Sequence, residues 1–359
     1  MAQSEGTITG GDYLDFENSV AEIDSQIAEL VRLSSVKGIG YSAEIRKLER
    51  ERVTELKRIY GQLTAWQTVQ VARHTKRPLF SDYLNLMVKD FHELHGDRCF
   101  GDDRAIVTGI GQIGRNKVMI VGQNKGRTTK EKIACNFGCP NPEGYRKALV
   151  KMKFAQKYGL PIVTLIDTPG AYPGVGAEER GQAQAIAVNL AQMSQLEVPI
   201  VCICIGEGGS GGALGIGVGD RTAMLEYAYY SVISPEGCAG ILWRDGSQAP
   251  EAAEALKLTS GDLQKLGLID AIIKEPVGGA HRNVHDTVWN VEGYINKTLT
   301  ELKRLSKDKL LASRYKKWRT AGSDFTKIVA KKPAAEKTKI TPVPSTKSVK
   351  EKQVTPIQI

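Results

Sequence analysis

The chain of 359 residues has no apolar stretch long enough to span a membrane, which takes about 20 consecutive apolar residues. Residues 1–17 include acidic side chains but no positively charged segment followed by an apolar core, so they resemble neither a secretory signal nor a transit peptide. A hydrophobic content of 41% over this length allows one large core or two modest ones. We therefore expect a soluble, cytoplasmic protein without a membrane association.

The six cysteines do not follow a zinc-site pattern, because no two of them are spaced C-x-x-C. Cys135 and Cys139 are separated by three residues, and no second Cys or His pair follows them at a zinc-site distance. Cys202 and Cys204 alternate with β-branched residues, which is typical of a buried strand. We expect no metal in this chain and a core position for Cys202 and Cys204.

Positive charge is unevenly distributed along the chain. The net charge is +9, but residues 301–359 carry a balance of +11, which leaves residues 1–300 at −2. From Lys331 onward the sequence is rich in Lys, Pro, Thr and Ser and has no aromatic residue, so it cannot bury enough surface to order itself. We expect a solvated tail there; weak binding of RNA or an acidic protein is the alternative.

The most informative pattern is a glycine-rich run that follows the apolar residues 199–205 and leads into the small residues 213–219. Its sequence is Gly206-Glu207-Gly208-Gly209-Ser210-Gly211-Gly212. A strand that ends in such a turn and opens a helix directs several backbone N–H groups at one point. These groups can stabilise a negatively charged oxygen, so the run predicts an oxyanion site.

Three other interpretations of the glycine run explain it less well. A phosphate loop requires Lys and then Ser or Thr after its last glycine, where Ala213 and Leu214 stand. The dinucleotide spacing G-x-G-x-x-G occurs, but the turn follows a late strand and the acidic residue about twenty positions on, Glu226, lies in a hydrophobic segment. Close packing of a helix on a sheet would explain one glycine, but several together cost much backbone entropy.

The hydrophobic periodicity predicts a helical arm followed by an α/β domain with a layered sheet. Residues 16–33 and 42–71 have helical spacing and form the arm, and residues 105–113 and 117–123 form a β-hairpin. The elements expected after the hairpin are helices at 143–158 and 178–195, strands at 161–167, 199–205, 221–226 and 230–234, a β-rich segment at 268–274 bracketed by short helices, and a helical pattern at 284–318.

The segment that begins Asp167-Thr168-Pro169-Gly170 follows the strand expected at 161–167. It resembles the magnesium segment of GTPases, but the chain has no phosphate loop upstream. Residues 167–181 therefore favour a shaped loop at the carboxyl end of a strand, where ligand sites of α/β proteins gather.

Five segments together closely resemble the α-subunit family of bacterial-type acetyl-CoA carboxylase carboxyltransferases. They are Lys125-Gly126-Arg127, residues 167–181, residues 206–219, Ser234-Pro235-Glu236-Gly237-Cys238 and Gly278-Gly279-Ala280-His281-Arg282-Asn283. The resemblance extends from about residue 15 to about residue 318 and consists of long blocks in the same order. It is therefore far more specific than a single glycine motif.

The resemblance implies a crotonase-like (ClpP/crotonase) α/β fold of repeated ββα units. Together with the periodicity and composition, it divides the chain into an N-terminal helical arm over residues 1–79, a carboxyltransferase domain with a closing C-terminal helix over residues 80–320, and a basic disordered tail over residues 321–359, which falls outside the resemblance. The implied reaction transfers a carboxyl group from carboxybiotin to acetyl-CoA and gives malonyl-CoA, the first committed step of fatty acid synthesis. The implied partners are a zinc-bearing β subunit in an α2β2 assembly, the biotin carboxyl carrier protein and biotin carboxylase.

The resemblance also assigns roles by position. The donors for the biotin oxyanion fall on the backbone N–H groups of Gly211 and Gly212, with Gly208, Gly209 and Ser210 shaping the turn. Such a pair can stabilise charge on the ureido oxygen without any side-chain nucleophile. The residues implied to line a cavity shared with the β subunit are Gly170, Ala171, Tyr172, Pro173, Gly174, Val175 and Gly176.

Charged residues near these segments allow two interpretations each. The cluster of Lys125, Arg127, Lys130 and Lys132 could contact CoA phosphates or the partner subunit, or it could be a solvated loop. Glu207 could place a charge near the site, although capping of the following helix is the simpler account.

Two other functions remain open from the sequence. One is a different crotonase-type acyl-CoA enzyme, such as a hydratase or a carboxyltransferase for propionyl-CoA; a hydratase needs an acidic side chain opposite the oxyanion turn, and none is evident. The other is a non-catalytic role of the basic tail.

Overall fold

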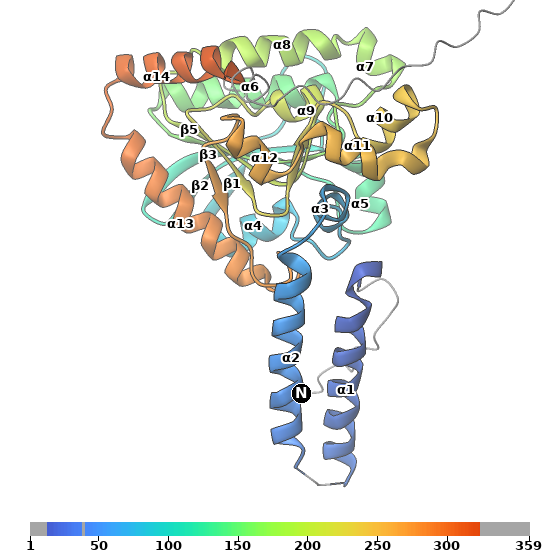
Figure 1. Ribbon diagram of the computed structural model, residues 1–359. Helices are drawn as coiled ribbons and strands as arrows, with labels where there is room; N and C mark the ends of the chain where they lie inside the picture. Colours follow the sequence, from blue (N-terminus) through green and yellow to red (C-terminus); the bar gives the residue numbers. More distant parts are fainter. Residues whose placement is uncertain (1–12, 38–39, 324–359) are drawn as a thin grey trace, which may run out of the picture. The chain divides into compact units, whose positions relative to one another are not determined.

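Two long helices pair at the start of the described part of this computed structural model, which comprises residues 13–37 and 40–323. After the 3-10 helix η1 (Asp15–Glu17), α1 (Asn18–Lys37) lies beside α2 (Ser42–Tyr60) (Figure 1). This confirms the predicted helical hairpin. The second helix is shorter than predicted, because α3 (Ala65–Ala72) begins anew: the Thr64 hydroxyl accepts the Gln67 N–H, and the Gln67 side chain accepts the Thr64 N–H.

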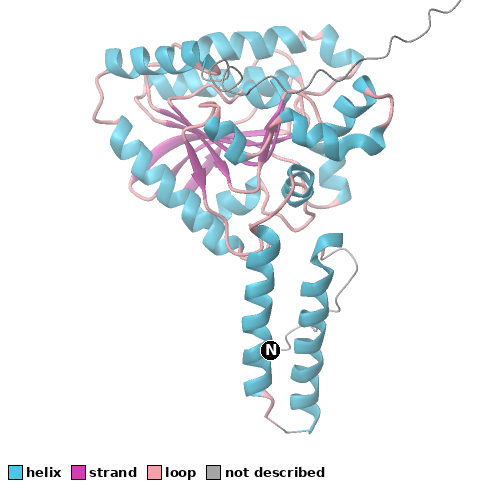
Figure 2. Ribbon diagram, viewed as in Figure 1, coloured by secondary structure: helices cyan, strands magenta, loops and turns pink. Residues whose placement is uncertain are grey.

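An eight-stranded sheet lies at the centre of the domain (Figure 2). Its order is β1-β2-β3-β4-β5-β6-β8, and β7 also pairs with β5. β2 pairs antiparallel with both β1 and β3, and the remaining strand pairs are parallel. The strands are β1 (Val88–Glu93), β2 (Ile106–Ile113), β3 (Asn116–Gln123), β4 (Ile162–Thr168), β5 (Ile200–Gly209), β6 (Arg221–Leu225), β7 (Tyr229–Ser231) and β8 (Ala271–Ile273).

The predicted hairpin is confirmed by β2 and β3, whereas β1 was not predicted. The sequence of β1 is largely charged and leaves none of its residues fully buried, so it carries little strand signal. The central strands β4 and β5 are buried along their whole length. Cys202 and Cys204 have no exposed surface, which confirms their predicted place in the core.

Helices cover both faces of the sheet. In Figure 1, α6, α8 and α14 lie on one side, and α4 and α13 lie on the other. The helices that follow α3 are α4 (Phe80–Met87), α5 (Thr129–Ala134), η2 (Asn136–Gly138), α6 (Pro142–Lys157), α7 (Val175–Glu179), α8 (Gln182–Met193), α9 (Ser210–Leu214), α10 (Pro235–Leu242), η3 (Gly246–Gln248), α11 (Ala249–Leu256), α12 (Ser260–Lys265), α13 (Val284–Leu302) and α14 (Lys307–Thr320).

Two further predicted helices are each divided in the structure. The one expected at 178–195 is broken at Gly181, whose φ of +80° suits glycine and separates α7 from α8. The one expected at 284–318 is broken before Ser306, whose hydroxyl accepts the Lys309 N–H and caps α14. The closing helix is anchored by the buried Arg314, which forms an ion pair with Asp220 at 2.7 Å.

The described residues up to Gly322 belong to one compact unit. None of the helices within the described ranges has the length and apolar character needed to cross a bilayer. Apart from residues 321–323, the predicted basic tail, with the RNA-binding alternative attached to it, lies outside the described residues.

Candidate active site

The glycine-rich run lies where three parallel strands end at one edge of the sheet, because β3, β4 and β5 run in the same direction. The predicted turn is displaced along the chain. β5 continues to Gly209, so Gly208 and Gly209 are strand residues rather than turn residues. The reversal occurs at Ser210, whose φ of +51° is rare for a side-chain-bearing residue and which begins α9.

Two glycines allow the β5–α9 connection to lie directly against the loop after β4. A Cβ atom on Gly209 would lie 2.1 Å from the Pro169 carbonyl oxygen, and one on Gly212 would lie 2.5 Å from the Ala171 nitrogen. Close packing therefore explains these two glycines, which agrees with the packing interpretation given in the sequence analysis. It does not explain Gly211, where a Cβ would meet only the Ile186 side chain at 3.8 Å.

The structure therefore brings together two predicted segments, the oxyanion turn and residues 170–176. The loop is fixed at Tyr172, whose N–H donates to the Pro140 carbonyl at 3.0 Å and whose carbonyl accepts the Gln182 side-chain amide at 3.0 Å. Val175 is 76% exposed, and the Tyr172 side chain packs over Gly174. The loop thus presents apolar groups at the surface next to the turn.

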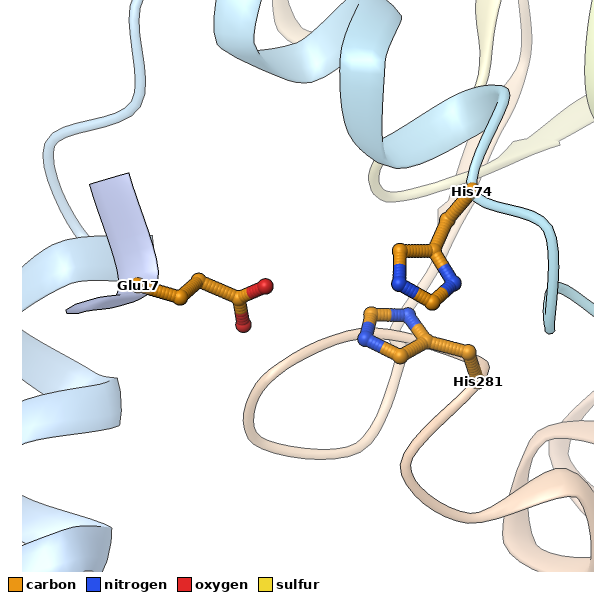
Figure 3. Close-up of side chains that lie close together, drawn as sticks. All are labelled: Glu17, His74 and His281. Atoms are coloured by element: carbon orange, nitrogen blue, oxygen red, sulfur yellow. The ribbon is translucent and has the colours of Figure 1, made fainter. Parts of the chain in front are cut away.

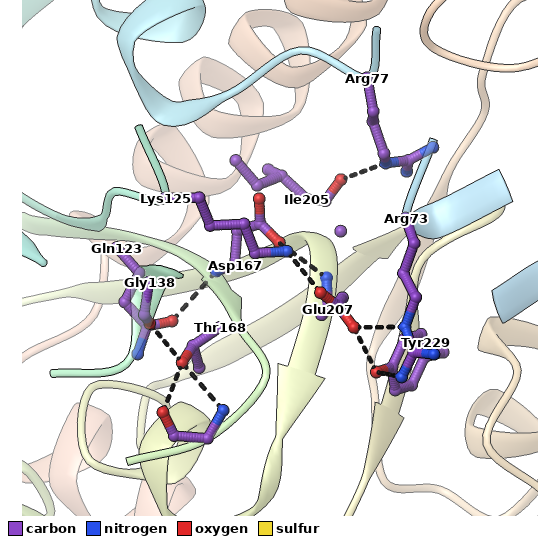
Figure 4. Close-up of polar contacts among 12 residues, drawn as sticks. Arg73, Arg77, Gln123, Lys125, Gly138, Asp167, Thr168, Ile205, Glu207 and Tyr229 are labelled. Atoms are coloured by element: carbon purple, nitrogen blue, oxygen red, sulfur yellow. Dashed lines mark hydrogen bonds and ion pairs between the residues drawn. The ribbon is translucent and has the colours of Figure 1, made fainter. Parts of the chain in front are cut away.

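Beneath the turn lies a buried ion cluster, which Figure 4 shows. The Lys125 ammonium is 2.6 Å from an oxygen of Asp167 and 2.7 Å from an oxygen of Glu207. Only 17% of the Lys125 side chain is exposed. The alternative that Lys125 belongs to a solvated loop is therefore wrong, because two carboxylates bind its ammonium in the interior.

Glu207 does not cap the following helix, which corrects the simpler interpretation from sequence. Its carboxylate accepts from Arg73 Nε at 2.7 Å and from the Tyr229 hydroxyl at 2.6 Å, in addition to Lys125. Burial alone would raise the pKa of Glu207, but Lys125 and Arg73 outweigh it and hold the pKa at about 2. Burial likewise opposes the charge of Lys125, yet Asp167 and Glu207 raise its pKa. Glu207 and Lys125 therefore keep their charges at neutral pH.

The other three basic residues lie away from this cluster. Arg127 forms an ion pair with Asp82, and on α5 Lys130 is exposed and Lys132 is half-buried. Arg127 lines a groove of about 700 Å³ that also contains Glu131. The groove carries both signs of charge, so the predicted contact of these residues with CoA phosphates or a partner stays a prediction.

Glu17, His74 and His281 form a group whose potential ligand atoms lie within 4.8 Å of one another (Figure 3). The geometry opposes a metal ion. His74 Nδ1 accepts the backbone N–H of Lys76, which leaves the proton of the neutral ring on Nε2, and the two imidazoles are stacked at 3.9 Å rather than turned toward a common point. The Glu17 carboxylate is already paired with Arg282 at 2.8 Å.

This group makes stability depend on pH. Burial, followed by the nearby His74 and Arg282, lowers the pKa of His281 from 6.5 to about 2. The unfolded chain therefore binds one more proton than the folded chain between these values. Stability is full above pH 6.5 and is expected to fall below it by about 1.4 kcal/mol per pH unit, or about 3 kcal/mol by pH 4.5. Urea unfolding over this pH range measures the loss.

Replacing the histidine identifies the source of this loss. His281→Phe keeps a flat ring for stacking but removes the titrating group, so its stability should vary less with pH between 6.5 and 4.5. His285→Asn is the matched control, since His285 is exposed. An identical pH dependence in wild type and His281→Phe would contradict the assignment.

Residues 13–322 match the family model described as acetyl co-enzyme A carboxylase carboxyltransferase-like. The chain belongs to this family. Over 312 residues it is 55% identical to the acetyl-coenzyme A carboxylase carboxyl transferase subunit alpha of Rhodopirellula baltica, covering 87% of this chain and 98% of the relative. It is 53% identical over 313 residues to the protein of the same name from Coxiella burnetii, covering 87% and 99%.

The fold of this carboxyltransferase-family chain is also found among solved structures. A Pseudomonas malonate decarboxylase hetero-tetramer in complex with coenzyme A aligns with a TM-score of 0.51, covering 64% of this chain and 92% of the other. The two are 14% identical, so the likeness concerns the fold alone. It confirms the predicted crotonase-like α/β class.

Several residues that build the site were missed from sequence. Gln123, Tyr145, Arg73 and Tyr229 all contact the turn or the ion cluster. The one local signal was Gln123, a polar residue that ends the apolar run of β3 and is fully buried. Arg73 directly follows α3, Tyr145 lies on α6 and Tyr229 lies on β7, so only the fold brings these three to the site.

Proposed function

We propose that this chain is the α subunit of acetyl-CoA carboxylase carboxyltransferase, and that it transfers the carboxyl group of carboxybiotin to acetyl-CoA to give malonyl-CoA. Membership of the family supports the proposal, together with relatives of this name that are matched along nearly their whole length. The biotin would be carried by a separate biotin carboxyl carrier protein, and the CoA thioester would be the acceptor.

The observation that carries the proposal is the turn between β5 and α9. Gly211 and Gly212 lie in the first turn of α9, where backbone N–H groups have no carbonyl within the helix to bind. When the bond from biotin N1 to the carboxyl carbon breaks, the electron pair gives the ureido oxygen negative charge, which two N–H donors can stabilise. The biotin anion can then take a proton from the acetyl methyl group, whose carbon binds the released CO2.

The ionised cluster is suited to supporting this turn rather than to moving protons. Lys125 and Glu207 keep their charges over the neutral range, since the pKa of Glu207 is about 2 and that of Lys125 is raised. A general base works best with a pKa near the working pH, which neither group has. Proton transfer by the biotin anion itself agrees with this arrangement.

A zinc-bearing β subunit would supply the second half of the active site, in an α2β2 assembly that works with biotin carboxylase. The exposed Tyr172 and Val175 beside the turn support a partner at this surface, because apolar side chains there would be covered by it. This chain would then hold the biotin-side oxyanion donors only.

Activity is expected only when the two subunits are combined. We would measure carboxyl transfer from malonyl-CoA to biocytin with this chain alone, with the β subunit alone and with both. The chain alone should show no turnover above background, and the mixture should be active. Turnover by the isolated chain, or none in a complex shown to be intact by size-exclusion chromatography, would contradict the proposal.

A further inference from the structure

The buried side chain of Gln123 links the end of β4 to the turn between β5 and α9. Gln123 is the last residue of β3 and has no exposed surface. Its side-chain NH2 donates to the Gly212 carbonyl at 2.8 Å, and its side-chain oxygen accepts the Asp167 N–H at 3.0 Å. One amide thus binds both the end of β4 and the turn after β5.

The Gly212 carbonyl depends on side chains for its hydrogen bonds. In a continuing helix it would accept the N–H of Ile216, four residues later, but that N–H donates to the Ala213 carbonyl at 3.3 Å. Gln123 supplies one donor, and the Tyr145 hydroxyl supplies a second at 3.1 Å. Both donors come from elements outside the turn.

We propose that Gln123 is a positioning residue, which fixes the peptide orientation at Gly212 and thereby aims the oxyanion donors. This inference rests on the proposed function. The α-carbon of Gly212 is held against Ala171 and Gly170, so fixing its carbonyl leaves the residue little freedom in φ and ψ. The Gly212 carbonyl belongs to the peptide bond with Ala213, whereas the Gly212 N–H belongs to the preceding peptide, so Gln123 acts on that N–H through the restricted φ and ψ of Gly212. This restriction matters because a misplacement of about 1 Å can cost 100-fold in rate.

The Gln123→Glu variant distinguishes the contributions of the two hydrogen bonds. In Gln123→Glu the carboxylate still accepts the Asp167 N–H, but it faces the Gly212 carbonyl with an oxygen instead of a donor. Protonation restores an O–H that can donate to Gly212. In the assembled complex at pH 8.5, kcat should fall by about 10- to 100-fold with little change in KM for malonyl-CoA. Relative to wild type, kcat should recover as the pH is lowered to 6.

Two further variants separate positioning from a loss of stability. Tyr145→Phe removes the second donor to Gly212 and should lower kcat without the pH-dependent recovery. Ser260→Ala removes a buried hydroxyl that donates to the Glu226 carbonyl at 2.7 Å, so it tests the loss of a buried hydrogen bond away from Gly212. It should lower the melting temperature while lowering kcat much less than Gln123→Glu does.

A second measurement does not depend on activity. Amide hydrogen exchange in peptides covering residues 205–214 should be about tenfold faster in Gln123→Met than in wild type, because the peptide at Gly212 loses its main donor. If the wild-type complex transfers no carboxyl group, the proposed function fails, but faster exchange would still support the positioning role. Unchanged exchange in Gln123→Met, or a kcat for Gln123→Glu that equals wild type at every pH, overturns the inference.

Discussion

Gly212→Val is expected to reduce kcat of the assembled carboxyltransferase by more than about 100-fold, the cost of losing an oxyanion-hole donor. The reason is steric and begins at Cβ, which would lie 2.5 Å from the Ala171 nitrogen and the Gly170 carbonyl carbon. These are backbone atoms that cannot rotate away. The valine must therefore push the β5–α9 turn away from the loop and redirect the donors. Transfer from malonyl-CoA to biocytin measures the loss.

Gly211→Ala is the matched control for this variant. A Cβ on Gly211 would meet only the Ile186 side chain at 3.8 Å, an ordinary contact, and alanine keeps the backbone N–H. Its melting temperature should stay close to that of wild type, and it should keep most of the activity. Full activity in Gly212→Val would exclude Gly212 as a donor. A collapse of Gly211→Ala similar to that of Gly212→Val would mean that any side chain here blocks the cavity.

The sheet and most of its helices follow from sequence because their signals are local. Apolar β-branched runs predict β3, β4 and β5, and helical spacing predicts α1, α6 and α13. The errors occur where a single residue changes direction within a continuous pattern. Gly181 and the capping residues Thr64 and Ser306 each interrupt a helix without interrupting its periodicity.

The position of the glycine run shows a different limit. From sequence, glycines after a strand indicate a turn, but β5 continues to Gly209 because β7 pairs with its end. That pairing involves residues more than twenty positions later in the chain. The sequence therefore predicts the turn in the right region, but strand pairing within the fold moves it a few residues later, to Ser210.

Lys125 shows why charged residues of the site were misassigned. It lies in a segment rich in Lys and Arg, which resembles a solvated loop, and its partner Glu207 is 82 residues away in sequence. Local composition cannot report such a pair. The predicted donors Gly211 and Gly212 came from a resemblance in sequence, while the residues that hold them, such as Gln123, became visible only in the fold.

Lys125→Met is expected to destabilise the chain by about 3–5 kcal/mol, the usual cost of removing one partner of a buried ion pair. It leaves two carboxylates, Asp167 and Glu207, close together with only 6% and 9% of their side chains exposed. Arg73 still neutralises part of this charge through its ion pair with Glu207, so the loss of stability should lie nearer the lower end of this range. Urea unfolding at pH 7 measures this loss of stability. The value of kcat should fall as well, because Asp167, which loses its ion pair with Lys125, also accepts the backbone N–H of Glu207 at the end of β5 that leads into the turn.

The pH dependence distinguishes charge repulsion from lost packing. In wild type the pKa of Glu207 is about 2, below its usual 4.5, so its contribution to stability is present above pH 4.5 and is lost only as the pH falls toward 2. Without Lys125 that pKa must rise, and the variant should lose less stability than wild type on mild acidification. Adding Glu207→Gln to Lys125→Met should recover part of the loss, because it removes one of the two facing charges. If the double variant instead loses as much stability as the two single variants together, the effect of Lys125 comes from the packing of its methylene groups.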